Sequence, residues 1–371
     1  MFAGNSADDF DRNVWCLLGL VFDAVDLKAA SGAVHIAALD NSNCFISTPN
    51  LNFTIAALDD PEFLKSIINS DLSLIDGMPL LWVARLLGSG LDTKVSGSDL
   101  FDELWRHSDP GGNDLKVFFF GGDEGTGERA CNKINSVKGG LTCAGYLNPG
   151  FGSNDEISSQ HIIDRLNESK SDFLVVALGA KKGQNWINQN HERLNIPVVS
   201  HLGAVLNFVA GNVKRAPLWM QRSGLEWVWR IQQEPSLWRR YFVDGLGFTR
   251  LFFTRVLPYV FWRLTHTGLL DNDQPVSCKV DISQDQIVIR ISGSCLHANI
   301  EPLRKIFSEV SNQAKSVKLD LSKVPVVDGA FLGLCLVLLK HVKKTGRELS
   351  VSGLSPNLVR IFHWNCVEFL L

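Results

Sequence analysis

The stretch Phe173-Leu174-Val175-Val176-Ala177-Leu178-Gly179 decides the fold, because six consecutive apolar residues end in a glycine before a helical pattern begins. Three similar runs are Cys44-Phe45-Ile46-Ser47-Thr48 before Pro49-Asn50, Val117-Phe118-Phe119-Phe120 before Gly121-Gly122, and the shorter Val198-Val199-Ser200. Continuous apolar strands that alternate with helices are typical of a parallel sheet covered on both faces. We therefore predict an α/β fold with a Rossmann-like parallel sheet.

Polar and small residues follow these strands. Sheets of this kind bind ligands beyond the carboxyl ends of their strands, where Thr48, Gly121, Gly122 and Gly179 fall. Glycine lets a backbone approach a ligand closely, and it equally permits a tight strand-to-helix turn. The pattern predicts a nucleotide-type cleft without identifying the nucleotide.

Composition bounds the class of protein. The chain has 371 residues, 45% of them hydrophobic and 20% charged, which fits two packed globular domains. The net charge of −3 does not discriminate between partners, but basic residues concentrate between Lys214 and Arg263. No DNA-binding motif accompanies them, so we expect no nucleic-acid partner.

The eight cysteines form no Cys-x-x-Cys pair, so we expect no structural zinc site and predict buried free thiols in a reducing cytoplasm. Acidic residues interrupt any signal peptide near the start of the chain. The nearest candidate for a membrane span, Leu251 to Leu264, falls short of about 20 apolar residues and contains Arg255 and Arg263.

The chain divides by pattern into five segments. We predict a flexible N-terminus (1–13), a first domain (14–240), an amphipathic appendage (241–267), a polar linker (268–275) and a small α/β domain (276–371). The last segment has strand patterns at Gln286–Ile291, Val317–Asp320 and Leu349–Val351, and helical patterns at Phe331–Lys343 and Leu358–Trp364.

Several motifs of the first domain, taken together, resemble the WecG/TagA/CpsF family of bacterial glycosyltransferases. They occur in the family's order: Thr48-Pro49-Asn50, Asp76-Gly77, Gly97-Ser98-Asp99, Gly121-Gly122, Gly150-Phe151, and the tail Arg215-Ala216-Pro217-Leu218-Trp219 with Gly224-Leu225-Glu226-Trp227. The resemblance covers residues from about Val14 to about Leu264, and the tail is its most specific part.

The resemblance implies an inverting, metal-independent transferase without a cofactor. Such an enzyme moves an N-acetylhexosamine or a uronic acid from a UDP-sugar to a saccharide on undecaprenyl diphosphate. It would work in cell-surface polysaccharide biosynthesis, in the cytoplasm and peripherally attached to the inner face of the membrane.

The resemblance also suggests catalytic residues. Asp76 matches the family's catalytic aspartate and can accept the proton of the acceptor hydroxyl; alternatively, it caps the helix predicted from Met78 to Leu87. Thr48 and Asn50 can hold a sugar hydroxyl or the departing diphosphate, or they can form a turn. Asp99 either contacts substrate or caps a helix.

Arginines of the tail are candidates for stabilising the leaving group. Arg230, Arg239 and Arg240 carry guanidinium groups that match phosphate oxygens in pairs. The alternative is a basic surface that faces anionic lipid.

Two segments depart from the family's pattern. The usual Gly-x-Pro-Lys-Gln-Glu-x-Trp reads Gly179-Ala180-Lys181-Lys182-Gly183-Gln184-Asn185-Trp186, and Asn207 stands where an aspartate is common. Gln184 and Asn207 keep hydrogen-bonding groups but lose charge. We interpret this as altered donor choice. The alternatives are a non-catalytic protein that senses nucleotide sugars and, on the weak motif Gly121-Gly122-Asp123-Glu124-Gly125, a dinucleotide oxidoreductase.

The appendage has a helical apolar stripe, made of Phe253, Val256, Leu257, Val260, Phe261 and Leu264. Tyr259, Trp262 and nearby arginines favour a helix in the lipid headgroup layer, which Pro258 would kink or break. The alternative is an ordinary core-facing helix.

Residues 276–371 resemble a STAS domain of the anti-sigma-factor-antagonist type. Matching features include Val317-Lys318-Leu319-Asp320-Leu321-Ser322, Val326-Val327-Asp328-Gly329 and Gly346-Arg347-Glu348-Leu349. Many members carry a phosphorylatable hydroxyl after that aspartate, where this chain has Gly329 and Ala330. We therefore expect binding of a protein partner, or self-association, without a phosphate switch; a passive structural appendage is the alternative.

Overall fold

A computed structural model describes residues 8–109, 111–270 and 274–371. The described chain forms two compact units. The first unit comprises residues 25–81 and 93–244, and the second comprises residues 8–24, 82–92 and the described part of 245–371.

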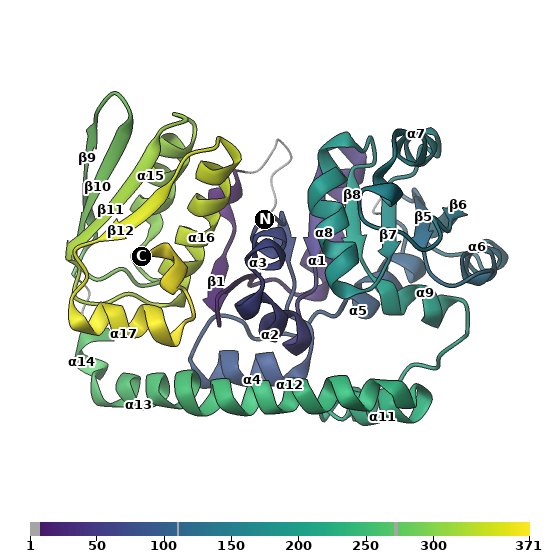
Figure 1. The fold of residues 1–371 in the computed structure, drawn as a ribbon, viewed down its shortest axis with the longest axis horizontal. Helices are drawn as coiled ribbons and strands as arrows, with labels where there is room; N and C mark the ends of the chain where they lie inside the picture. Colours follow the sequence, from purple (N-terminus) through teal and green to yellow (C-terminus); the bar gives the residue numbers. More distant parts are fainter. Residues whose placement is uncertain (1–7, 110, 271–273) are drawn as a thin grey trace. The chain divides into compact units, whose positions relative to one another are not determined.

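The first unit is built on a six-stranded, fully parallel sheet with strand order β4-β3-β8-β7-β5-β6 (Figure 1). Its strands are β3 (Cys44–Ser47), β4 (Leu72–Ser73), β5 (Leu115–Gly121), β6 (Leu141–Leu147), β7 (Phe173–Ala177) and β8 (Val198–His201). The predicted parallel sheet and all four predicted strands are confirmed. The sequence pattern missed β4, which has two residues, and β6, whose residues alternate between buried and more exposed positions.

Helices cover both faces of this sheet. Those that pack on it are α1 (Leu27–Leu39), α5 (Gly97–Arg106), α6 (Thr126–Ser136), α7 (Gln160–Glu168), α8 (Ala180–Asn190) and α9 (Gly203–Val209). The unit also contains α2 (Leu51–Asp59), α3 (Pro61–Ile68), α10 (Leu218–Arg222) and α11 (Glu226–Gln233). Short 3-10 turns lie at Glu156–Ser158, His191–Arg193 and Pro235–Leu237. Two further helices, α4 (Met78–Leu86) and α12 (Trp238–Leu251), have residues in both units.

Successive side chains of each strand point to opposite faces of the sheet and so form two buried apolar layers, one on each face. Val117 and Phe119 of β5 pack with α1, α5, α6 and α9 on one face. Phe118 and Phe120 pack with α7 and α8 on the other face, where the Trp186 ring lies 4.6 Å from that of Phe120. Because successive side chains of a strand point to opposite faces, a continuous apolar run supplies both layers.

The second unit contains a four-stranded sheet of order β12-β11-β10-β9, in which only the β9–β10 pair is antiparallel. Its strands are β9 (Ser277–Ile282), β10 (Gln286–Ser292), β11 (Ser316–Lys323) and β12 (Leu349–Ser352), and a separate hairpin pairs β1 (Val14–Leu17) with β2 (Leu20–Asp23). Its helices are α13 (Leu257–Thr265), α14 (Thr267–Leu270), α15 (Glu301–Ser311), α16 (Gly329–Lys344) and α17 (Pro356–Trp364), with 3-10 turns at Asp9–Asp11 and Glu368–Leu370.

The β1 strand packs against α16, and two glycines make this approach close. An ideal Cβ at Gly333 would lie 3.0 Å from the Cys16 nitrogen, and one at Gly329 would lie 3.0 Å from the Cys16 carbonyl oxygen. Residues 14–24 were predicted to belong to the first domain. Their contacts lie with the second unit, where this glycine surface accepts the backbone of β1, and the predicted domain boundary stays a prediction.

The described part of the N-terminus also differs from the flexible segment predicted for residues 1–13. Phe10 is fully buried, and the Arg12 guanidinium pairs at 2.7 Å with both Asp9 and Asp23. Arg304 of α15 donates to the Phe10 carbonyl at 2.7 Å. Residues 1–7 of that prediction lie outside the described residues.

A continuous helical segment runs from α12 into α13 through a π-helical turn at Phe252–Val256. Pro258 was expected to kink or break the helix. It lies instead in the first turn of α13, where a missing N–H is tolerated. The predicted linker also differs, since its residues up to Leu270 belong to α14; residues 271–273 lie outside the described chain.

Two cysteines correct the expectation of eight free thiols. Cys131 of α6 and Cys143 of β6 form a disulfide, because these adjacent elements bring their Cα atoms to 5.1 Å. The other six cysteines are not disulfide-bonded within the described chain.

The glycine surface on α16 gives a prediction about stability. Gly333→Ala should lower the free energy of unfolding of the second unit by about 1–3 kcal/mol, because the new methyl group meets the backbone of β1. Gly245→Ala is the matched control: this helical glycine has open space around it, so the change should raise stability by about 0.5–1 kcal/mol. Urea denaturation of both variants measures the difference, and equal effects would contradict close packing at Gly333.

Candidate functional site

Asp76 lies at the carboxyl edge of the parallel sheet, three residues after β4. The loop that carries it is tied to the loop after the neighbouring strand β3, because the Asp76 N–H donates to the Pro49 carbonyl at 3.0 Å. The Val95 N–H donates to the Ile75 carbonyl, also at 3.0 Å. Backbone hydrogen bonds on both sides therefore fix the position of the Asp76 carboxyl.

Four charged side chains surround Asp76. Lys94 lies 3.8 Å from Asp99 and 3.8 Å from Glu226, and Arg215 pairs with Asp99. Asp99 in turn forms a capping box with Ser96 at the start of α5, which confirms the capping alternative for this residue. Arg215 and Glu226 both come from the tail, so the tail contributes charge next to Asp76.

Burial raises the pKa of Asp76 to about 7, and the carboxylates of Glu226 and Asp99 add to this rise. Lys94 and Arg215 act in the opposite direction. A carboxyl group with a pKa near neutrality gives up and takes up protons readily at physiological pH, as a general base requires.

Thr48 and Asn50 lie beside this group. Thr48 is buried, and its Oγ1 lies 3.4 Å from the position of a Cβ on Gly97. The side-chain oxygen Oδ1 of Asn50 accepts a hydrogen bond from the Phe53 N–H at 3.2 Å, so Asn50 caps the start of α2. Asn50 therefore has a structural role in capping, and its role toward a substrate stays a prediction.

Three predicted glycines lie at the same edge of the sheet. A Cβ on Gly121 would lie 2.5 Å from the Ala177 carbonyl oxygen, and one on Gly122 would lie 2.4 Å from a Leu206 methyl group, so both positions require glycine for packing. Gly179 has a positive φ of 84° and open space where a side chain would project. Of the three, Gly179 leaves room for a ligand next to the backbone.

Gln184 contacts the carboxyl end of β3, because its side chain bonds to Ser47, the last residue of that strand. Its side chain is fully buried, and its amide donates to the Ser47 hydroxyl and, at 3.3 Å, to the Ser66 carbonyl. Gln184 therefore has a structural role in the interior of the unit, and its role toward a substrate stays a prediction.

Gly183 lies against a histidine. A Cβ at Gly183 would lie 2.3 Å from Cδ2 of His201, the last residue of β8, so the imidazole occupies the space of a side chain. Burial lowers the pKa of His201 to about 4, so the ring is neutral at pH 7. Its Nε2 is buried without a hydrogen-bond partner among the described residues.

The remaining predicted residues lie in α9 and in the tail. The Asn207 carboxamide accepts from Asn212 at 3.1 Å. Arg230 is partly buried, pairs with Glu234 at 2.7 Å and lies over the Phe208 ring. Arg239 and Arg240 are exposed and lie over Trp238 and Tyr241. None of these contacts joins the three arginines to Asp76.

Sequence reasoning missed the charges closest to Asp76, which are Lys94, Arg215 and Glu226. The last two lie within the tail motif that carried the resemblance, so the signal was present but their roles were not considered. Nothing in the sequence marked Lys94, because its distance from Asp76 depends on the loop between α4 and α5.

Within residues 8–109, 111–270 and 274–371, no three His, Cys, Asp or Glu side chains are grouped as a metal site would require.

Comparisons with known proteins place the chain in a family. Residues 15–259 match the model of the glycosyl transferase WecG/TagA/CpsF family, and residues 278–365 match a family model described as Mlab, STAS domain. Two similar proteins are N-acetylglucosaminyldiphosphoundecaprenol N-acetyl-beta-D-mannosaminyltransferases. The one from Bacillus spizizenii is 29% identical, over 59% of this chain and 83% of its own length. The one from Bacillus subtilis is 28% identical, over 53% of this chain and 73% of its own length.

The charges around Asp76 give a prediction about its titration. Lys94→Met should raise the pKa of Asp76 further, because it removes a nearby positive charge, and Glu226→Gln should lower it, because it removes a negative one. Carbon-13 NMR of the aspartate carboxyls, assigned with Asp76→Asn, follows the titration. If neither substitution moves the Asp76 signal, these charges do not act on it.

Proposed function

Since the chain belongs to the WecG/TagA/CpsF family of glycosyl transferases, we propose that it moves a sugar of the N-acetylhexosamine or uronic acid type from a UDP-sugar to a saccharide on undecaprenyl diphosphate. The family match confirms the resemblance and the glycosyltransferase activity. The printed names of the relatives support the acceptor, because each contains a diphosphoundecaprenol-linked sugar. The single structural observation that carries the proposal is the partly buried carboxyl of Asp76, held among charged side chains at the carboxyl edge of the sheet.

In the proposed reaction, Asp76 takes the proton from the acceptor hydroxyl as its oxygen attacks the anomeric carbon of the donor sugar. The bond between that carbon and the phosphate oxygen breaks, and the electron pair leaves with UDP. Attack from the face opposite the leaving group inverts the anomeric centre. A pKa near 7 leaves a large fraction of Asp76 ionised at neutral pH and still able to hold a proton.

Cations of the tail stabilise the departing diphosphate in this proposal. The Nε–H groups of Arg215 and Arg230 are buried and have no hydrogen-bond partner within the described part of the chain. Phosphate oxygens satisfy such donors with strong, charge-assisted hydrogen bonds. Lys94, beside Asp76, adds a further positive charge, while the exposed Arg239 and Arg240 are free to meet phosphate or anionic lipid.

The altered segment after β7 bears on the choice of donor. His201 fills the space beside Gly183, where the family's pattern has glutamine, so a neutral ring stands in the position of a carboxamide. We propose that this exchange changes which sugar the site accepts and leaves Asp76 in place. The alternative, a protein that binds nucleotide sugars without turnover, rests on the same departures from the pattern.

Asp76→Asn should reduce transfer by about 100-fold or more with the fold retained, because the amide cannot accept the proton. Asp59→Asn changes an exposed aspartate of the same unit and should leave the rate unchanged. The assay measures UDP release from a panel of UDP-sugars, including UDP-N-acetylmannosamine, with an undecaprenyl-diphosphate-linked N-acetylglucosamine acceptor. Wild-type turnover that survives in Asp76→Asn would remove this residue from the mechanism, and binding without release from any donor would favour the alternative.

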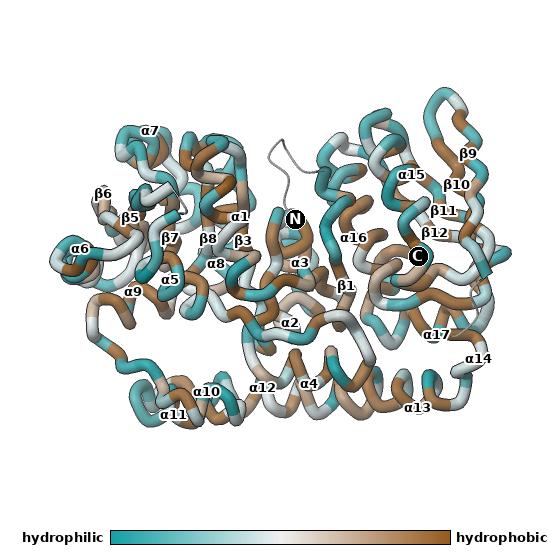
Figure 2. Tube along the Cα trace, turned by 180° about the vertical axis from the view of Figure 1, so that it is seen from behind, coloured by the Kyte–Doolittle hydropathy of each residue, from teal (hydrophilic) through white to brown (hydrophobic). Residues whose placement is uncertain are grey.

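The appendage presents two apolar faces. Val256, Tyr259 and Trp262 are buried, and Tyr259 and Trp262 pack against Trp364 of α17, so these aromatics do not face lipid as predicted. A second face, the outer stripe, is exposed; Figure 2 shows apolar residues recurring along α13. Its members are Leu246, Phe253, Leu257, Phe261 and Leu264, with exposed fractions between 43% and 71%.

The outer stripe supports peripheral attachment to a membrane. No helix in the described ranges combines the length and apolar character needed to cross a bilayer. Large apolar side chains that stay in water, on a helix whose other face already packs in a core, are typical of a surface that lies in the lipid headgroup layer. We propose that the stripe holds the enzyme at the leaflet that carries its acceptor.

Replacing Phe253, Phe261 and Leu264 by serine should weaken binding to anionic vesicles at least about tenfold, since each large apolar side chain contributes roughly 1.5–3 kcal/mol when buried. The matched control replaces Val280, Ile282 and Val359, exposed apolar residues of the same unit outside the stripe. Vesicle sedimentation measures both variants. Equal binding by the two would show that the stripe does not contact lipid.

We also propose that the STAS-like segment binds a protein partner without phosphate control. The position after Asp328 has no hydroxyl, and β1 covers it so closely that a Cβ would lie 3.0 Å from the Cys16 carbonyl oxygen. A phosphate group does not fit there.

A further inference from the structure

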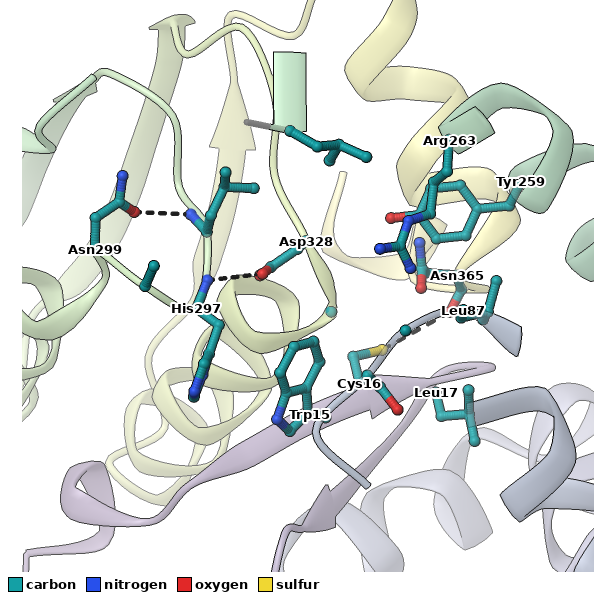
Figure 3. A pocket seen from close by; sticks show the side chains of 16 residues that line it. Trp15, Cys16, Leu17, Leu87, Tyr259, Arg263, His297, Asn299, Asp328 and Asn365 are labelled. Carbon is teal, nitrogen blue, oxygen red and sulfur yellow. Dashed lines mark hydrogen bonds between the residues drawn. The ribbon is translucent and has the colours of Figure 1, made fainter. Parts of the chain in front are cut away.

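A cavity of about 260 Å³ lies within the second unit (Figure 3). Its lining comes from segments far apart in the sequence: β1, the loop after α4, α13, the turn at residues 296–299, the start of α16 and the end of α17. Neither the proposed transfer reaction nor the outer stripe uses this cavity.

Apolar and aromatic side chains form much of its wall. The Trp15 ring lies along the cavity and packs against the His297 imidazole, with ring centroids 5.1 Å apart. Leu17, Leu87 and Leu296 add aliphatic surface. Such a wall accommodates the apolar or planar part of a small organic molecule.

Arg263 supplies the positive charge. Figure 3 shows its guanidinium group pointing into the cavity from α13, beside Tyr259 and Asn365. The guanidinium group of Arg263 lies next to Gly88. A Cβ at position 88 would lie 3.0 Å from Nη2 of Arg263, so a residue without a side chain leaves space for the guanidinium group. Among the residues that the structure describes, no carboxylate forms an ion pair with Arg263, although a partly buried cation is stabilised by a counter-ion.

Asp328, the carboxylate that lines the cavity, is already occupied by backbone donors. Its Oδ2 accepts from the His297 N–H at 2.7 Å, and its Oδ1 accepts from the N–H groups of Ala330 and Phe331 at 3.0 and 3.1 Å. Burial raises the pKa of Asp328, and these three backbone hydrogen bonds at the start of α16 act against that rise. Asp328 therefore serves as a helix cap, and Arg263 remains available to a ligand.

We propose that this cavity binds a small organic anion, whose carboxylate or phosphate group pairs with the Arg263 guanidinium and whose apolar or planar body packs against Trp15. A guanidinium group binds either oxyanion through two parallel hydrogen bonds. Tyr259 and Asn365 line the same side but are buried, and Asn365 donates to the Ile361 carbonyl at 2.8 Å, so the Arg263 guanidinium carries the recognition of the anion. The residues that line the cavity belong to the second unit, whereas Asp76 belongs to the first.

Ligand-observed NMR on the full chain tests the proposal with four probes. Phenyl phosphate and benzoate carry the two anionic groups on a planar body, benzyl alcohol has the body without the charge, and inorganic phosphate has the charge without the body. We expect one or both aromatic anions to bind at least tenfold more tightly than benzyl alcohol and inorganic phosphate. The better of the two identifies the anionic group, and displacement of it by phosphatidylglycerol vesicles would identify a lipid headgroup as its source.

Two variants and a control locate the binding. Arg263→Gln should weaken binding of the aromatic anion at least tenfold, and Ala298→Phe, which places a ring in the cavity, should do the same without removing a charge. Arg360→Gln, an exposed arginine on α17 outside the cavity, should bind like the wild type. No binding of either anion at 10 mM, which is about ten times a weak 1 mM Kd, overturns the proposal. Equal binding by Arg263→Gln and wild type would also overturn it.

Discussion

The proposed chemistry depends on the partly buried carboxyl group of Asp76 and on the charge of Lys94 near it. Burial raises the pKa of Asp76 above that of an ordinary aspartate, and the positive charges of Lys94 and Arg215 act against this rise. The resulting pKa is about 7. This balance requires the tail, because Arg215 and Glu226 both come from it. The tail motif therefore has an electrostatic role at the base as well as the role toward the diphosphate that its arginines suggest.

The second unit depends on close packing between the backbone of β1 and the helix α16. Gly329 and Gly333 allow β1 to lie against α16, and this contact joins the N-terminal hairpin to the STAS-like fold. The same packing covers the position at which a phosphorylatable hydroxyl would stand. The helical segment through α13 then has one apolar face for this core and another exposed to solvent, which separates its structural function from its proposed attachment to lipid.

The sequence predicted the parallel sheet well because its central strands are continuous apolar runs, such as Phe173–Ala177, which only a doubly covered sheet accommodates. It could not predict β4, whose two residues carry no periodicity. In the site, Asp76 and the strand-end glycines follow from motifs, whereas Lys94 depends on the path of a loop. The burial of Gln184 and its bond to Ser47 could not be predicted, because a motif does not report which side of its helix faces the interior. The contact of the N-terminal hairpin with α16 could not be predicted, because no local pattern reports a contact with residues more than 300 positions away.

The pH dependence of kcat for the wild-type enzyme, with saturating donor and lipid-linked acceptor, tests the central claim most directly. If Asp76 is the base, kcat should fall as the pH drops through about 7, because protonation removes its ability to accept the acceptor's proton, and should level off above that value. A rate that stays constant from about pH 5 to 8, across the range in which this carboxyl would take up its proton, would contradict the account.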